Sequence, residues 1–364
     1  MQMYRSDCRH FRGDIPCRPH KTFGVTCDNC SHYEQRTGRI LIIKLGATGD
    51  VLRTTPILAP LRERYPGHEI WWITLSPDAV PSTVQKRLPW TWETALTVTQ
   101  TSFDVVICLD KDVEACALAQ QVDARERYGF TLVDGLPAPV NNLAEHKYIT
   151  GIFDSANKAN TKSYPQELME LCGFEWSGQE YEYDEQGNLP ETWELVLKGQ
   201  KGPFVGLNTG CGDRWIAREW PQENWAKLIR LLKKDGVTVV LLGGPAEHER
   251  NIGLMATTGA FYAGLAPLKE FINIVGRCDV VVTTVTMALH AAIARRRQVV
   301  LMNNIFNRHE FELYGRGVIV EPPVTCTCFF QHDCTNPSYR CMSELTPDTL
   351  LEAVRSRLAV LRQA

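Results

Sequence analysis

The sequence predicts an α/β protein with two doubly wound, parallel-sheet domains that face a central cleft. The chain has 364 residues, which exceeds one ordinary hydrophobic core and suits two domains. Continuous β-branched runs alternate with segments of helical spacing, a pattern typical of a parallel sheet covered on both faces. The alternation is interrupted at residues 175–202, where the chain is polar and acidic. We interpret this stretch as a linker that contains a short helix.

The first series of elements predicts an N-terminal domain at residues 39–185. RILIIKL, at 39–45, has the composition of a buried strand, and residues 51–65 have helical spacing. Further strands are predicted at 69–75, 103–109 and 126–132.

The second series predicts a C-terminal domain at residues 200–345. A strand at 203–208 precedes an amphipathic helix at 220–236 that Gly236 ends. The elements expected after it are a strand at 238–244, a helix from Pro245, a helix at 266–278, and then strand, helix, strand and strand between residues 279 and 322.

The last segment, residues 346–364, predicts a C-terminal helix. Thr346 is the expected N-cap, and Pro347 suits the first helical position.

Composition limits the classes of function. Hydrophobic residues make up 44% and charged residues 22%, as in soluble globular proteins. A net charge of -3 gives no overall attraction to nucleic acid. No apolar run approaches the roughly 18 residues of a membrane span, and residues 1–30 lack a signal-peptide core. We expect a cytoplasmic protein, with peripheral contact at the inner face of the membrane left open.

The thirteen cysteines favour metal binding over disulfides if the compartment is reducing. Five are scattered, and eight form two sets of four near the chain ends: Cys8, Cys17, Cys27 and Cys30 in a Cys-rich extension of residues 1–38, and Cys326, Cys328, Cys334 and Cys341 in a finger at 326–341. Each set could enclose one structural zinc or iron ion in tetrahedral thiolate coordination. A neighbouring histidine could replace one cysteine, and reduced, unligated thiols are the alternative.

The stretch ILIIKLGATGDVL places one carboxylate after a strand and a glycine-containing loop. Gly46 and Gly49 permit close approach of the backbone, and Asp50 lies near a helix N-terminus. Asp50 is either a helix cap or a general base held at the cleft. The spacing matches neither a dinucleotide fingerprint nor a P-loop, which disfavours dehydrogenases and kinases. Asp110, which ends another predicted strand, is the second candidate base.

Three strand-to-helix turns of the second domain suit an anion. Their backbone amides could cradle a phosphate, and arginine suits a diphosphate. The candidate ligand-binding residues are Thr209, Gly210, Arg214, Arg218, Gly243, Gly244, Thr286, Met287 and His290. Together they predict a site for a nucleoside diphosphate.

These segments resemble glycosyltransferase family 9, the heptosyltransferases of lipopolysaccharide and related glycans. The matching stretches are ILIIKLGATGDVLRTTPIL, REWPQENWAKLI, VVLLGGPAEHE, TMALHAAIA, the tail CTCFFQHDC and the following TPDTLLEAV. They span most of residues 39–360 in the order of the family. The resemblance implies the GT-B fold, with two Rossmann-like domains, nucleotide-sugar in the C-terminal one and acceptor in the N-terminal one. It also implies inverting transfer without a catalytic metal.

Roles implied by the resemblance can be carried over to single residues. Asp50 of the GD motif corresponds to the general base, Arg218 to a diphosphate ligand, and Glu247 to the acid that binds the ribose. Thr209, Thr286 and His290 fall where the family lines its donor pocket. One departure is that Val285 stands where many members have an aspartate, which leaves the sugar open.

The resemblance favours transfer of heptose from ADP-heptose to a lipopolysaccharide or related glycan. A protein acceptor is the first alternative, because the cysteine-rich tail resembles the metal finger of members that glycosylate proteins. A non-catalytic nucleotide-sugar-binding or metal-dependent assembly protein is the second. A sugar-nucleotide 2-epimerase shares the architecture but would convert the donor without an acceptor. A homo-oligomer is compatible with each reading.

Overall fold

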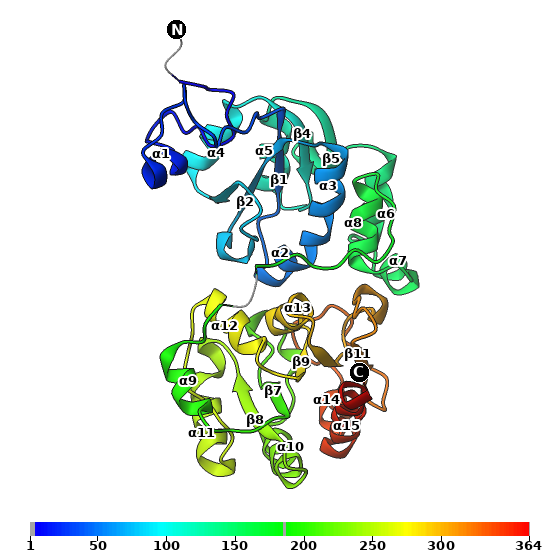
Figure 1. Ribbon diagram of the computed structural model, residues 1–364. Helices are drawn as coiled ribbons and strands as arrows, with labels where there is room; N and C mark the ends of the chain where they lie inside the picture. The colour runs from blue at the N-terminus through cyan, green and yellow to red at the C-terminus, as the bar shows by residue number, and fades with distance from the viewer. Residues whose placement is uncertain (1–3, 185–186, 364) are drawn as a thin grey trace. The chain divides into compact units, whose positions relative to one another are not determined.

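The computed structural model describes residues 4–184 and 187–363, and it divides into two compact units (Figure 1). The first unit comprises Met1–Gly46, Ile57–Tyr148 and Leu168–Glu175, and the second comprises Ala47–Pro56, Ile149–Glu167 and Trp176–Ala364. The predicted domains are consecutive segments, whereas these units are not. Two segments from the first half of the chain pack with the second unit, and one of them carries Asp50.

The first unit contains a six-stranded sheet in the order β3-β2-β1-β4-β5-β6. Its strands are β1 (Gly38–Ile43), β2 (His68–Thr74), β3 (Lys86–Pro89), β4 (Phe103–Cys108), β5 (Ala124–Val133) and β6 (Leu136–Pro139). Ile40 pairs with Ile70 of β2 on one side and with Val105 of β4 on the other. The strands that follow β1 in the chain are added first on one side of it (β2, β3) and then on the other side (β4, β5, β6). The order of the strands therefore switches between β1 and β4, next to the loop that follows β1.

Two edge strands of this sheet are absent from the sequence prediction. The strand β3 has the polar sequence KRLP, and β6 contains two prolines. Neither shows a hydrophobic run, because an edge strand is paired on one side only and proline is tolerated there. The strand β6 pairs antiparallel to β5.

The helical segment predicted at 51–65 is divided in the structure. It forms α2 (Thr48–Thr54), a 3-10 turn (Thr55–Ile57) and α3 (Leu58–Arg64). The division falls at Pro56, which has no backbone N–H to continue the helical hydrogen bonds. Six further helices in residues 4–184 were not predicted: α1 (Arg18–Phe23), α4 (Trp92–Thr99), α5 (Val113–Gln121), α6 (Asn142–Thr150), α7 (Asp154–Ala159) and α8 (Tyr164–Leu171).

The second unit contains a five-stranded parallel sheet in the order β11-β10-β9-β7-β8. Its strands are β7 (Phe204–Asn208), β8 (Thr238–Leu242), β9 (Val280–Thr284), β10 (Gln298–Met302) and β11 (Gly317–Val320), as the sequence predicts. The chain builds β8 on one side of β7 and then returns to add β9 on the other. Ligands of open α/β sheets favour the carboxyl ends of the strands at such a switch point, here the loops after β7 and β9.

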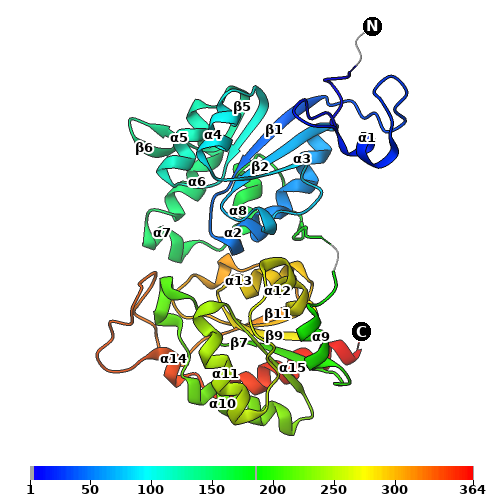
Figure 2. The same ribbon diagram turned by 90° about the vertical axis from the view of Figure 1, so that its left-hand side faces the viewer.

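Helices flank this second sheet, and the predicted ones are found. They are α9 (Glu191–Leu197), α10 (Gln222–Lys234), α11 (His248–Thr258), α12 (Leu268–Val275), α13 (Met287–Ala294) and α15 (Pro347–Gln363). The short helix α14 (Cys341–Glu344), at the end of the predicted cysteine finger, was not predicted. The hydroxyl of Thr346 accepts a hydrogen bond from Thr349 N at 3.2 Å, which confirms the predicted N-cap. The helix α15 packs along α10 (Figure 2), where Arg355 pairs with Asp235 at 2.6 Å.

The interpretation of residues 175–202 as a linker is wrong for Trp176–Asp184, because this segment packs onto the second unit. Tyr181 is buried, and Glu180 pairs with Arg316 at 2.7 Å. Its alternation of acidic and aromatic residues has the composition of a solvated linker, but the rings of Trp176 and Tyr181 pack against Tyr314.

The described residues include no helix that is both long and apolar enough to cross a lipid bilayer.

Candidate functional site

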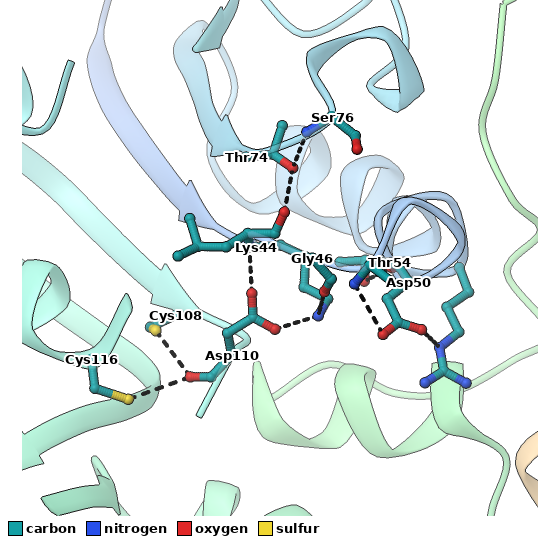
Figure 3. A network of polar contacts seen from close by, with 12 residues as sticks. Lys44, Gly46, Asp50, Thr54, Thr74, Ser76, Cys108, Asp110 and Cys116 are labelled. Carbon is teal, nitrogen blue, oxygen red and sulfur yellow. Dashed lines mark hydrogen bonds and ion pairs between the residues drawn. The ribbon is translucent and has the colours of Figure 1, made fainter. Parts of the chain in front are cut away.

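Asp50 lies in the first turn of α2, where the loop that follows β1 enters the helix. Its Oδ2 accepts a hydrogen bond from Ala47 N at 3.4 Å, and its Oδ1 lies 2.9 Å from Nε of Arg53. The hydroxyl of Thr54 donates to the Asp50 carbonyl at 2.6 Å (Figure 3). The Asp50 side chain remains 32% exposed. The carboxylate therefore caps its helix and is also open to a reacting molecule.

Arg53 is a site residue that the sequence analysis missed. Its guanidinium lies 3.5 Å from the ring centroid of Tyr164, a cation–π contact, while Nε faces Asp50. The Arg53 side chain is 14% exposed. It thus holds the Asp50 carboxylate in one orientation. The signal in the sequence was its spacing of three residues from Asp50, which places both side chains on one face of a helix.

Gly49 is a glycine because α2 packs closely on α13. A Cβ atom at Gly49 would lie 2.6 Å from Cδ2 of His290 and 3.4 Å from the Cα of Met287. The predicted glycine loop therefore has a packing role at Gly49. This contact places Asp50 beside the first turn of α13.

We expect Gly49→Ala to lower the free energy of unfolding by about 1–3 kcal/mol, the usual cost of overpacking a close contact. Urea unfolding would measure the change. Gly46→Ala is the matched control, since a Cβ there would meet only Leu75 Cδ1, at 3.8 Å. Equal stability of the two variants would contradict a tight contact between α2 and α13.

His290 is buried within α13 and faces Tyr181, whose hydroxyl lies 3.2 Å from His290 Nδ1. Burial lowers the pKa of His290 to about 3, and the charge of Arg53 acts in the same direction. The imidazole is therefore neutral near pH 7. It can line a pocket or form hydrogen bonds, but it supplies no positive charge to a diphosphate.

This neutral histidine predicts a dependence of stability on pH. The unfolded chain binds a proton at His290 below its ordinary pKa of 6.5, whereas the folded protein does so only near pH 3. Stability should consequently fall as the pH drops from about 6.5 toward 3. We expect His290→Gln to lose less stability than wild type between pH 7 and pH 4.5, measured by urea unfolding. An identical loss in both proteins would contradict this assignment.

Polar side chains join the loops that follow β7 and β9. Nδ2 of Asn208 donates to the Gly210 carbonyl at 3.0 Å and to the Thr286 hydroxyl at 3.3 Å. The hydroxyl of Thr284 also donates to the Gly210 carbonyl, at 3.3 Å. Thr286 caps α13 by accepting from Ala288 N. The structure therefore brings Gly210, Thr286 and Met287 together at the switch point of the second sheet.

Glu247 occupies the space above two of the predicted glycines. Its Oε2 accepts a hydrogen bond from Gly244 N at 2.8 Å. A Cβ at Gly210 would overlap the Glu247 carboxylate, and one at Gly243 would lie 2.6 Å from Glu247 Cβ. These two glycines thus make room for one carboxylate at the ends of β7 and β8.

The Thr209 side chain supports the loop after β7 and is not exposed for contact with a bound nucleotide. It is 1% exposed, and its hydroxyl donates to Asn251 Oδ1 at 2.6 Å. Nδ2 of Asn251 donates in turn to the Leu242 carbonyl at 3.2 Å. Asn251, which the sequence analysis missed, therefore ties the end of β8 to the loop after β7.

The two predicted arginines have different surroundings. Arg218 is 4% exposed, and its guanidinium donates to the carbonyls of Trp215, Cys211 and Val285. Burial lowers the pKa of Arg218 to about 10, so it stays charged at neutral pH. Arg218 therefore clamps the loops after β7 and β9.

Arg214 lies on the surface of the same segment. Within the part of the chain that the structure describes, its guanidinium forms no hydrogen bond or ion pair and lies 5.3 Å from the ring centroid of Trp215. Of the two arginines, it is the one available to an anion without breaking existing contacts.

Asp110, the second candidate base, lies in a buried ion pair of the first unit. Its carboxylate contacts the Lys44 ammonium, as Figure 3 shows, and it also accepts a hydrogen bond from Leu45 N. Burial raises the pKa of Asp110, and Lys44 opposes this shift. With 6% of its surface exposed, Asp110 holds the loop after β1 and is not open to a substrate. The prediction that it could act as the base is therefore disfavoured.

All thirteen cysteines are free thiols, and each terminal set is gathered in space. In the tail, a hydrogen bond to Cys326 lowers the pKa of Cys341, and Cys328 lies close to Cys334. Near the N-terminus, Cys8, Cys17, Cys27 and Cys30 line one small cavity. Across residues 4–184 and 187–363, however, no three His, Cys, Asp or Glu side chains are placed as around a bound metal. The two metal sites therefore remain predictions.

The fold matches that of known GT-B glycosyltransferases. The crystal structure of a family 9 glycosyl transferase from Veillonella parvula DSM 2008 superposes with a TM-score of 0.65 and 16% identity, covering 88% of this chain and 97% of that chain. E. coli ADP-heptose lps heptosyltransferase II superposes with a TM-score of 0.65 and 17% identity, covering 90% and 100%. The iron-containing dodecameric glycosyltransferase TibC of enterotoxigenic E. coli superposes with a TM-score of 0.55 and 13% identity, covering 89% of this chain and 77% of that chain. The predicted two-domain GT-B architecture is thereby confirmed.

The model of glycosyltransferase family 9 (heptosyltransferase) matches residues 92–316, more than half of the chain. The chain therefore belongs to glycosyltransferase family 9. Lipopolysaccharide heptosyltransferase 2 of Salmonella typhimurium is 23% identical over 167 residues, which are 44% of this chain and 45% of that enzyme. The E. coli K12 enzyme of the same name gives the same identity and coverage. The match spans less than half the length of these curated relatives.

Proposed function

We propose that this glycosyltransferase transfers a sugar from a nucleotide-sugar to an acceptor hydroxyl with inversion, and that Asp50 is the general base. One observation carries the proposal: the partly exposed Asp50 carboxylate lies on α2, and α2 packs on α13 next to its first turn. That turn also belongs to the rim of loops that includes Gly210 and Thr286. A base and an anion-binding rim thus adjoin within one unit.

The chemistry follows from this arrangement. Asp50 accepts the proton of the acceptor hydroxyl as its oxygen attacks the anomeric carbon from the side opposite the leaving group. The bond from the anomeric carbon to the diphosphate oxygen breaks, and the electron pair leaves with the nucleoside diphosphate. The developing positive charge on the sugar resembles the oxocarbenium ion of glycoside hydrolysis. Loop amides and Arg214 stabilise the leaving diphosphate, so no step requires a metal.

Arg218 acts indirectly in this scheme, by holding the two loops that face the diphosphate. Glu247 accepts hydrogen bonds from the ribose hydroxyls in this scheme, and the position of its carboxylate at the ends of β7 and β8 supports that role. His290 contributes a neutral pocket wall.

ADP-heptose is the donor that we propose. The curated relatives are lipopolysaccharide heptosyltransferases, and the similar fold of E. coli WaaC has been solved with ADP and with ADP-2-deoxy-2-fluoro heptose. The Val285 carbonyl accepts a hydrogen bond from Arg218, and its apolar side chain stands at the position where many members have a carboxylate. The contacts to the sugar must therefore differ from the usual ones even if the nucleotide is ADP.

Calorimetric titration with ADP, UDP, GDP, CDP and ADP-heptose tests the donor. We expect binding of ADP and ADP-heptose only. Preference for another nucleotide would contradict the proposal that ADP-heptose is the donor, but it would not contradict the proposal of glycosyl transfer. Binding of none of them would contradict the proposed donor site.

The acceptor that we propose is a hydroxyl of a lipopolysaccharide or related glycan, which implies contact with a membrane surface during catalysis. Mass spectrometry after incubation with ADP-heptose and heptose-free lipid-linked glycan should show the added sugar. Labelling of a protein fraction instead would favour the protein-acceptor alternative. Conversion of the donor alone, without any acceptor, would indicate an epimerase.

A further inference from the structure

The N-terminal extension encloses a small cavity of its own, apart from the site above. The cavity has a volume of about 20 Å³, enough for one water-sized particle. All four cysteines of the extension line it, together with His10 and His32. Within the described residues, none of these four thiols forms a hydrogen bond, a disulfide or an ion pair. Four cysteines with uncommitted thiols therefore line a space the size of a single ion.

The extension has almost no hydrophobic core to hold it in shape. Within residues 4–37 only Cys8 and Pro19 are buried, and the single helix is the short α1 (Arg18–Phe23). Its other contacts are mostly at the surface, and they include a bridge between Cys8 and Gln35 and the pair of Arg9 with Glu34. So little buried apolar area cannot offset the entropy of ordering this many residues, and segments of this kind depend on metals or cross-links.

The pair Cys27 and Cys30 sits on a tight turn. Asn29 N donates to the Thr26 carbonyl at 3.2 Å, and Thr26 N donates to Asn29 Oδ1 at 3.2 Å. This turn brings the two cysteines to the same cavity. Closely spaced cysteine pairs of this kind supply two of the four ligands in structural zinc sites.

We propose that Cys8, Cys17, Cys27 and Cys30 bind one structural zinc or iron(II) ion through four thiolates. The two histidines are engaged elsewhere, since His10 Nε2 lies 3.4 Å from Glu34 and His32 stacks on Phe23 at 4.4 Å between ring centroids. The sulfur atoms are not yet at ligand positions. Rotation about the Cα–Cβ bond moves a cysteine sulfur while its backbone stays in place.

Such an ion would tie three separated parts of the extension to one point. It joins the loop at Cys8, the start of α1 at Cys17 and the turn at Cys27–Cys30. Because an ion bound by four protein ligands has no open position, its role would be to fold the extension rather than to take part in transfer.

The test compares the reduced full-length protein with Cys27→Ser/Cys30→Ser and with a tail control, Cys326→Ser/Cys334→Ser. Each protein is stripped of metal and titrated with Co²⁺, while the sulfur-to-cobalt charge-transfer absorption is recorded. We expect the N-terminal variant to bind one equivalent fewer than wild type. The tail control should retain the N-terminal equivalent, and His10→Ala/His32→Ala should bind as wild type does.

Equal Co²⁺ stoichiometry in wild type and Cys27→Ser/Cys30→Ser would overturn the proposal. So would a mass of the unreduced protein that shows the four cysteines paired as disulfides. Nucleotide binding by the second unit serves as the folding control and should be unchanged in the N-terminal variant. Protease cleavage within residues 4–37 should accelerate in that variant, and unchanged cleavage would contradict a structural role for the ion.

Discussion

Asp50→Asn is expected to lower kcat by roughly 10²–10⁴-fold, the usual contribution of a general base. The amide keeps the shape of the side chain but cannot accept the proton of the acceptor hydroxyl. It can still receive the hydrogen bond from Ala47 N, so α2 keeps its cap. The rate of nucleoside diphosphate release would measure turnover, and calorimetry would show unchanged nucleotide affinity.

Asp112→Asn is the matched control for loss of one carboxylate. Asp112 is exposed at the start of α5, and its side chain makes no cap hydrogen bond. It should retain wild-type turnover. Turnover of Asp50→Asn within a few-fold of wild type would remove Asp50 as the base, and a decline in both variants would point to the Asp110–Asp112 loop.

Gly210→Ala is expected to weaken nucleotide binding by roughly 5- to 100-fold. A Cβ at this position overlaps the Glu247 carboxylate, so Glu247 must leave the place where it faces the donor loops. Overpacking costs about 1–3 kcal/mol, and 1.4 kcal/mol corresponds to tenfold in affinity. Calorimetric titration with ADP would measure the loss.

Gly253→Ala controls for the change of glycine to alanine in this unit. A Cβ there lies in α11 and meets only Gln222 Nε2, at 4.0 Å, so binding should be unchanged. In a Glu247→Ala background, Gly210→Ala should have little further effect, because the overlapping side chain is gone. Fully additive losses in the double variant would show that Gly210 acts independently of Glu247.

The alternation of apolar strands and helices predicted the central strands of both sheets and the carboxyl-end position of the glycine turns. This success has a physical reason: buried parallel strands must be continuously apolar, and polar loops must follow them. The edge strands β3 and β6 were not predicted, because a strand that pairs on one side only does not need a continuous apolar sequence. The motifs of residues 39–360 likewise predicted membership of a glycosyltransferase family.

The sequence by itself thus determined the two sheets, the strand-end loops and the single carboxylate of the GD motif. Only the tertiary structure decided which partners these residues have. Gly49 packs on His290, and Arg218 donates hydrogen bonds to three carbonyls. Tyr181, which lies in an acidic segment, contacts His290 through its hydroxyl. Local patterns report on burial and on turns, whereas these contacts join residues far apart in the chain. Their energies depend on close approach in space, which no periodicity of a single segment encodes.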